Sequence, residues 1–177
     1  MKTMAEDGSD LDFNNQGGDN ANGMDNAPSV GVLSQYIKDL SVENPNAPDS
    51  YNWGGQPQID VQVNIQSNAL NEEVHEVALR LNVKANGEKG VSFIVELVYC
   101  GLFGLRNVPE EAAHPFLFAE APRIIFPFAR RILADAVRDA GYPPLMLEPI
   151  DFNQLYMQQR EQAGAQAGGD QPPVGQA

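Results

Sequence analysis

The chain has 177 residues, a formal net charge of −13 at pH 7 and one cysteine. This length is enough for one domain with its own hydrophobic core. The acidic excess argues against a protein that binds nucleic-acid backbones, because such binding needs a basic surface, and it favours a basic partner. The single cysteine excludes an internal disulfide.

Both ends of the chain have a composition that is typical of disorder. Residues 1–28 contain six acidic residues against one lysine and are rich in Gly and Asn, and residues 161–177 consist mainly of Gln, Ala, Gly and Pro. Such segments cannot bury enough apolar surface to offset their chain entropy. We therefore predict a disordered acidic arm over 1–28, a folded domain over 29–160 and a disordered tail over 161–177.

The sequence shows no targeting or membrane segment. Lys2 is followed by acidic residues rather than by the apolar stretch of a secretory signal. No apolar run reaches the length that a membrane-spanning helix needs. We expect a cytoplasmic protein.

The first predicted strand covers residues 32–43, in which polar and apolar residues alternate. A period of two places Ile37 on the same face as Asp39 and Glu43. The prolines in residues 44–48 end this strand, because proline cannot donate to a sheet ladder. A polar loop follows and carries two large aromatic residues without apolar neighbours in the local sequence, Tyr51 and Trp53.

Three further strands are predicted over residues 58–66, 73–85 and 91–104. The last of them is apolar on both faces, although Glu96 interrupts one face. A tight hairpin turn is predicted over residues 86–90, before this strand, because its Asn86-Gly87 pair accepts the positive φ angles of such turns. Short connections between these strands favour one four-stranded antiparallel sheet.

Two helices are predicted after the sheet. Residues 109–115 suit a turn or a single helical turn. The first helix is expected to begin at residues 126–128, since proline is tolerated in a first turn, and to end at Gly141. The second begins at Asp151, an N-cap residue with Gln154 three positions later. The predicted fold class is α+β, with the two helices packed on one face of the four-stranded antiparallel sheet.

No catalytic residue, metal site or cofactor is predicted. His75 and His114 lack a second ligand at metal spacing, and Cys100 has no neighbouring base. The aromatic residues outside the strands exceed what a small sheet needs for its own core. Either the helices cover them, or they line an exposed apolar groove. They are Tyr51, Trp53, Phe152 and Tyr156.

Four segments, in this order, resemble the SecB family of bacterial protein-export chaperones: Tyr36–Pro48, Glu96–Phe103, Pro122–Arg130 and Pro143–Phe152. The resemblance spans about residues 32–160. It implies a homotetramer, a dimer of dimers, that holds secretory precursor proteins unfolded without ATP. It also implies that these precursors are passed to the SecA ATPase of the Sec translocase, with no nucleic-acid partner and no insertion into the membrane.

The resemblance also assigns roles to individual positions. The residues that match the SecA-docking positions are Asp39, Glu43, Ile94 and Glu96. The residues that match the client peptide groove are Tyr51, Trp53, Phe152 and Tyr156. The apolar stripe that would pack between subunits is Phe128, Ile132, Leu133, Ala136 and Val137.

Two features depart from the family pattern. Gly54-Gly55 separate Trp53 from the Gln-Pro pair that follows the tryptophan directly in the family. The C-terminal tail, which contacts SecA in the family, has no basic residue here. Two other functions stay open: a SecB-like chaperone dedicated to a toxin–antitoxin pair, and a small α+β hydrolase. The absence of a nucleophile–base pair argues against the hydrolase.

Overall fold

The computed structural model describes residues 26–167 of the chain. Most of the predicted N-terminal arm and the last ten residues of the predicted tail lie outside the described residues. The tail boundary predicted at residue 160 falls inside a helix, α3, which covers Phe152–Ala167. Within the described residues, no helix is long and apolar enough to cross a membrane.

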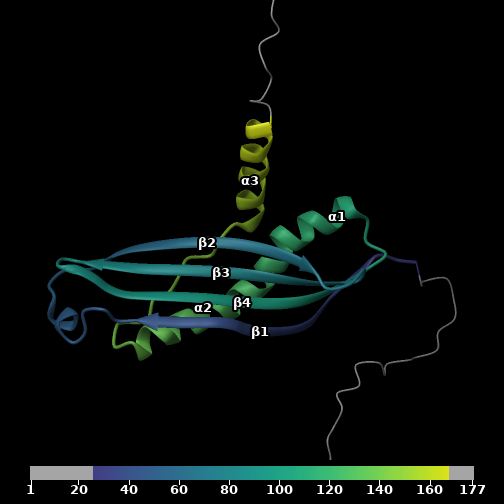
Figure 1. Ribbon diagram of the computed structural model, residues 1–177. Coiled ribbons are helices and arrows are strands. Elements are labelled where there is room, and N and C mark those ends of the chain that lie inside the picture. The colour runs from purple at the N-terminus through teal and green to yellow at the C-terminus, as the bar shows by residue number, and fades with distance from the viewer. Residues whose placement is uncertain (1–25, 168–177) are drawn as a thin grey trace, which may run out of the picture.

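Four antiparallel strands form one sheet, as predicted: β1 (Ser29–Glu43), β2 (Gln58–Ala69), β3 (Val74–Gly87) and β4 (Gly90–Arg106). Their order in the sheet is β1-β4-β3-β2, so β1 and β2 are the edges. Figure 1 shows the long strands side by side, with the single-turn helix η1 (Asp49–Asn52) in the loop between β1 and β2.

A continuous helical run follows the sheet and consists of α1 (Glu110–Pro115), the π-helical turn η2 (Phe116–Glu120) and α2 (Ala121–Asp139). The prediction that this helix begins at residue 126 was wrong. Pro127 lies inside α2, on its exposed side, where water can satisfy the carbonyl that loses its intrahelical donor. The predicted end at Gly141 is confirmed, since Gly141 has a φ of +92° directly after the helix.

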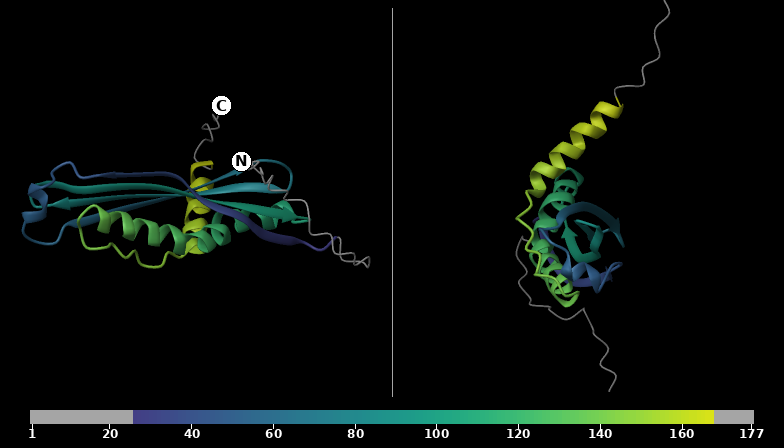
Figure 2. Two further views of the ribbon diagram at one scale, coloured as in Figure 1. Left: turned by 90° about the horizontal axis from the view of Figure 1, so that it is seen from below. Right: turned by 90° about the vertical axis from the view of Figure 1, so that its left-hand side faces the viewer.

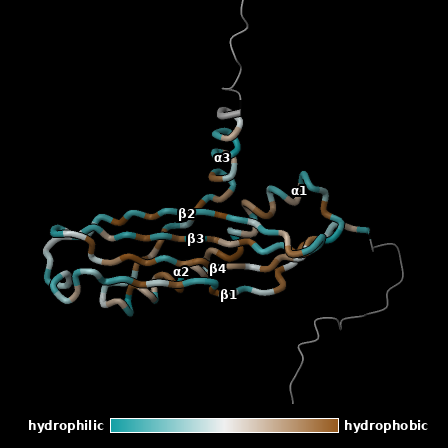
Figure 3. The backbone as a smooth tube through the Cα atoms, in the orientation of Figure 1, coloured by the Kyte–Doolittle hydropathy of each residue, from teal (hydrophilic) through white to brown (hydrophobic). Residues whose placement is uncertain are grey.

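The hydrophobic core lies between α2 and the two central strands. Figure 2 shows the helical run on one side of the sheet and α3 projecting away from it. Along the strands, hydrophilic and hydrophobic residues alternate (Figure 3), and the apolar set faces α2. Fully buried members of this core are Val77, Leu79, Leu81, Val83, Val95, Leu97, Phe103, Ile125, Leu133 and Val137.

Gly101 interrupts the apolar face of β4 for a steric reason. A Cβ atom at this position would lie 2.7 Å from the Phe103 ring and 3.0 Å from Cγ2 of Ile125. Both distances are shorter than ordinary van der Waals contact. The absence of a side chain at residue 101 therefore lets α2 cross close to β4, with the Phe103 ring folded into the vacated space.

The hairpin between β3 and β4 lies within the predicted turn, residues 86–90, but Asn86-Gly87 does not supply its positive φ angle, which occurs at Gly90. Gly87 pairs with Gly90, so the two central turn residues are Glu88 and Lys89. Gly87 has another role: a Cβ atom there would lie 2.7 Å from Cε3 of the Trp53 indole. The glycine makes room for an aromatic ring from the β1–β2 loop.

Candidate functional site

The face of the sheet opposite the helices, here called the outer face, is shaped by irregularities in β1. The register of β1 against β4 shifts between Val32 and Ser34 and again between Ile37 and Asp39. Each shift is a β-bulge, which places one extra residue in β1 and inverts the alternation beyond it. Asp39 therefore lies on the outer face and Ile37 on the helix side. The prediction that these two residues share a face was wrong.

All four predicted SecA-docking residues lie together on the outer face. Glu43 is paired with Ile94, Ser41 with Glu96, and Asp39 with Val98. The three carboxylates are exposed, and Ile94 is half-buried. We call Asp39, Glu43, Ile94 and Glu96 the acidic surface.

A shallow hollow of about 230 Å³ adjoins the acidic surface, and Ile94 and Glu96 form part of its lining. Its other side carries Asp60 from β2 and Lys84 from β3. Asp60 was not among the predicted site residues. Its outward position in the alternating strand 58–66 was the signal that could have identified it.

A hydrogen-bonded cluster lies beside the acidic surface. The Lys38 ammonium is 2.7 Å from Oε1 of Glu76, and the Tyr36 hydroxyl donates a hydrogen bond to Oε2 of the same carboxylate. The Glu76 side chain is only 12% exposed. These contacts were not predicted, because Glu76 lies on β3, separated by all of β4 from the strand that carries its partners.

The charges of this cluster stabilise one another. The hydrogen bonds from Lys38 and then Tyr36 hold the pKa of the Glu76 carboxyl below its usual value. The hydrogen bond to Glu76, with some burial, raises the pKa of Tyr36 to about 12. Burial, and then Glu76, raise the pKa of the Cys100 thiol to about 11. Cys100 is fully buried and packs as a small apolar residue, as predicted.

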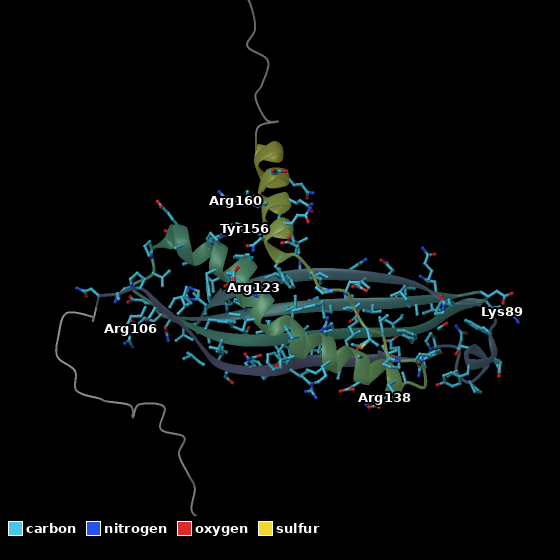
Figure 4. All side chains as sticks on the ribbon, turned by 180° about the vertical axis from the view of Figure 1, so that it is seen from behind. Lys89, Arg106, Arg123, Arg138, Tyr156 and Arg160 are labelled. Atoms are coloured by element: carbon cyan, nitrogen blue, oxygen red, sulfur yellow. The ribbon has the colours of Figure 1, made fainter. Side chains whose placement is uncertain are left out.

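Tyr51 and Trp53 line a hollow of about 280 Å³ at the hairpin end of the sheet, which Lys89 marks in Figure 4. The Tyr51 hydroxyl donates a hydrogen bond to the Ala140 carbonyl at 2.8 Å, and its ring lies 5.1 Å from that of Tyr142. Tyr51 is nevertheless 46% exposed, and Trp53 is half-buried. Apolar surface in this hollow is therefore accessible.

Phe152 and Tyr156 lie elsewhere, in the first turns of α3, where Figure 4 labels Tyr156. Phe152 is 2% exposed and packs edge-on against Phe126, with ring centroids 5.6 Å apart. The Tyr156 hydroxyl is 2.9 Å from Nδ1 of His114. The chain's own helices thus cover these two aromatic residues, and the structure does not bring them into one lining with Tyr51 and Trp53.

The predicted start of α3 at Asp151 is confirmed. The backbone N–H of Gln154 donates a hydrogen bond to Oδ1 of Asp151 at 2.9 Å. This cap fixes where the chain turns into α3 and so orients Phe152 toward η2 and α2. Arg160, one turn beyond Tyr156, lies over the Tyr156 ring at 5.9 Å.

The predicted intersubunit stripe on α2 divides between two faces of the helix. Three of its members are buried against the sheet of their own chain: Leu133, Ala136 and Val137. Phe128 is 45% exposed, and Ile132 is half-buried. Only these two retain surface that a second subunit can contact, because positions 128 and 132 lie on the flank of the helix rather than beneath it.

The edge strand β1 exposes an unusual amount of apolar surface. Figure 1 shows α2 crossing the sheet obliquely, and it packs chiefly on β4 and β3. The helix-side face of β1 consequently has little cover within the chain. Large apolar residues of β1 with at least 40% of their surface exposed are Val30, Val32, Leu33, Ile37, Leu40 and Val42.

Comparison with known proteins gives a consistent result. The family described as preprotein translocase subunit SecB matches residues 23–163. The chain is 59% identical over 175 residues to the protein-export protein SecB of Novosphingobium aromaticivorans, covering 98% of this chain and 100% of that one. It is 56% identical to the protein-export protein SecB of Erythrobacter litoralis, with 98% and 100% covered.

A solved structure shares the fold. The SecB-like chaperone Rv1957 of Mycobacterium tuberculosis, in complex with a ChAD peptide from the HigA1 antitoxin, matches with a TM-score of 0.58. The match covers 68% of this chain and 90% of that one, at 14% sequence identity. The predicted α+β class with a four-stranded antiparallel sheet is confirmed. The match of the family over most of the domain, together with relatives more than half identical along the whole chain, shows that this chain belongs to the SecB family.

Proposed function

We propose that this protein is an ATP-independent holdase that keeps secretory precursors unfolded and delivers them to SecA. The observation that carries the proposal is 59% identity, over nearly the full chain, to a relative named a protein-export protein. The toxin–antitoxin alternative is not favoured, since the antitoxin-bound SecB-like chaperone is only 14% identical. SecB is a family of chaperones rather than of enzymes, which also disfavours a hydrolase. Since precursors meet such a chaperone before they cross the membrane, the proposal implies a cytoplasmic protein.

The client site follows from the accessible aromatic surface. Extended segments of a precursor would place apolar side chains against Tyr51 and Trp53, with backbone contacts that require no particular sequence. Specificity would then be for the unfolded state. Weak individual sites would gain affinity when several subunits engage one chain, because the second contact is intramolecular.

The acidic surface suits a basic segment of SecA. Its three exposed carboxylates surround a half-buried isoleucine, so a partner segment can combine cationic and apolar contacts there. The attraction between exposed charges falls as salt is added. Asp39→Ala combined with Glu43→Ala is expected to weaken SecA binding about tenfold or more at low salt, and to leave precursor binding unchanged.

A homotetramer built as a dimer of dimers would cover surfaces that one chain leaves open. The apolar residues of β1 and the exposed ring of Phe128 offer such surfaces. Burial of apolar area contributes roughly 25 cal/mol per Å². Light scattering at micromolar concentration is expected to give the mass of four chains, and a monomer mass would refute the assembly.

One experiment tests the proposed function directly. The purified protein, at stoichiometric ratio and without nucleotide, is expected to slow the refolding of an unfolded precursor. Trp53, the only tryptophan, is expected to shift its fluorescence to the blue as the client covers it. An unchanged refolding rate would refute the holdase, and an unchanged spectrum at saturating client would exclude Trp53 from the site.

A further inference from the structure

The orientation of the acidic surface depends on one extra residue in β1. Ile37 and Asp39 lie opposite Tyr99 and Val98, which are consecutive in β4, so Lys38 has no partner in the ladder. Side chains in a strand alternate with period two, and an extra residue exchanges the two faces for everything beyond it. The bulge at Lys38 therefore decides which side of the sheet Asp39 and Glu43 occupy.

The regular register would bury both carboxylates. Continued from Ile37 without the bulge, the ladder would set Asp39 opposite Leu97 and Glu43 opposite Phe93. These two partners are 0% and 3% exposed and belong to the helix-side core. Unpaired carboxylates there are unfavourable. The bulged register also turns Leu40 and Val42 to the helix side. Their side chains stay 40% and 41% exposed there, so the burial of these two residues explains only part of the preference for the bulged register.

Glu76 contacts this bulge from two strands away. Its two carboxylate oxygens bind the bulged residue, Lys38, and a residue just before the bulge, Tyr36. In a regular ladder the Lys38 backbone would lie opposite Val98, further along β4 from Leu102, the residue that pairs with Glu76. The bulge therefore brings Lys38 closer to the Glu76 carboxylate. The mutual shifts in pKa, lowered for Glu76 and raised for Lys38, agree with a pair that stays charged.

We propose that Glu76 is a positioning residue for SecA binding, which clamps the Lys38 bulge and so presents Asp39 and Glu43 on the outer face. The inference rests on the proposed SecA contact and deepens it. Glu76 itself is nearly covered and acts through the carboxylates that it positions.

The first test measures SecA affinity by calorimetry at low salt. Glu76→Gln and Glu76→Ala are expected to weaken binding about three- to tenfold, which is comparable to the net contribution of one ordinary hydrogen bond. The loss should not exceed that of Asp39→Ala/Glu43→Ala. Glu73→Gln is the matched control, because it removes the same charge from an exposed residue near the start of β3. An equal loss of SecA affinity in Glu73→Gln would show that the effect comes from the change in net charge alone, and it would overturn the proposal.

The second test separates positioning from general destabilisation. In the Asp39→Ala/Glu43→Ala background, Glu76→Gln is expected to have no further effect on SecA affinity, and an undiminished effect there would overturn the proposal. Exchanging the charges, with Glu76→Lys and Lys38→Glu together, is expected to recover affinity relative to Glu76→Lys alone. A failure to recover would also count against the clamp.

Amide hydrogen exchange tests, in the absence of SecA, whether Glu76 stabilises the bulge at Lys38. Glu76→Gln is expected to lower the protection of residues 38–41 while that of β3 stays unchanged. Retained protection overturns the clamp. If Asp39→Ala/Glu43→Ala has no effect on SecA affinity, the proposed contact fails, whereas lost protection at residues 38–41 would still support the clamp. The two failures are therefore distinguishable.

Discussion

Replacing Phe152 with Ala tests whether α3 is attached to the domain through one main side chain. Phe152 is 2% exposed against Phe126, Tyr156 is the only other buried residue among the described side chains of α3, and the helix contacts chiefly η2. Truncation of a buried Phe costs roughly 3–5 kcal/mol. Because a terminal helix can move away rather than leave a cavity, we take the lower value. About 3 kcal/mol corresponds to roughly a hundredfold shift in the docking equilibrium.

Hydrogen exchange along α3 and β3 is the measurement. An undocked helix of this length is only marginally stable in water, so the protection of α3 amides is expected to fall while that of β3 stays the same. Met157→Ala is the matched control, since Met157 lies on the same helix and is 57% exposed. Equal protection of α3 in both variants would refute the anchoring role. An equal loss in β3 would show that α3 does not undock separately from the sheet.

Three further predictions follow from contacts and pKa shifts. Gly87→Ala is expected to displace the indole of Trp53, shift its emission to the red and cost roughly 1–3 kcal/mol in urea unfolding, whereas Gly31→Ala, which meets no atom within 4 Å, leaves the spectrum unchanged. Tyr36 is expected to ionise near pH 12 in ultraviolet titration, later than an ordinary tyrosine, and to move back toward 10 in Glu76→Ala. Because the folded pKa of Glu76 lies below its unfolded value, its contribution to stability is present above the unfolded pKa and is lost as pH falls through the folded one. Urea midpoints should therefore depend less on acid pH in Glu76→Gln; an unchanged dependence would contradict this assignment.

Alternation and capping made much of the fold predictable. The strict period of β2 and β3 reflects one face covered by the helical run, with β3 against α2 and β2 against η2, and one face in solvent. The helix signals at Asp151 and Gly141 act locally, through a side-chain hydrogen bond and a positive φ angle. Both kinds of signal depend on neighbours in the sequence, and both predictions were confirmed.

The missed features depend on partners distant in the sequence. The bulged residue Lys38 contacts a carboxylate on β3, which is distant in the sequence, so the pattern of residues 32–43 could not predict the bulge. Gly87 suggested a turn centre, but it makes room for Trp53. The start of the long helix was set too late, because Pro127 was placed in a first turn although tertiary packing holds it inside α2. For the acidic surface, the residues were predicted from family resemblance, and their arrangement became clear only through the register of β1.

The order β1-β4-β3-β2 has a consequence for how the domain is assembled. Strands β2, β3 and β4 form a meander in which each strand pairs with the next, so these contacts are local. The first strand instead pairs with the last, and Ser29 lies opposite Arg106. A chain emerging from the ribosome must complete β4 before β1 can dock. Until then β1 is itself an extended, apolar segment without a partner, which resembles the state in which a holdase receives its clients.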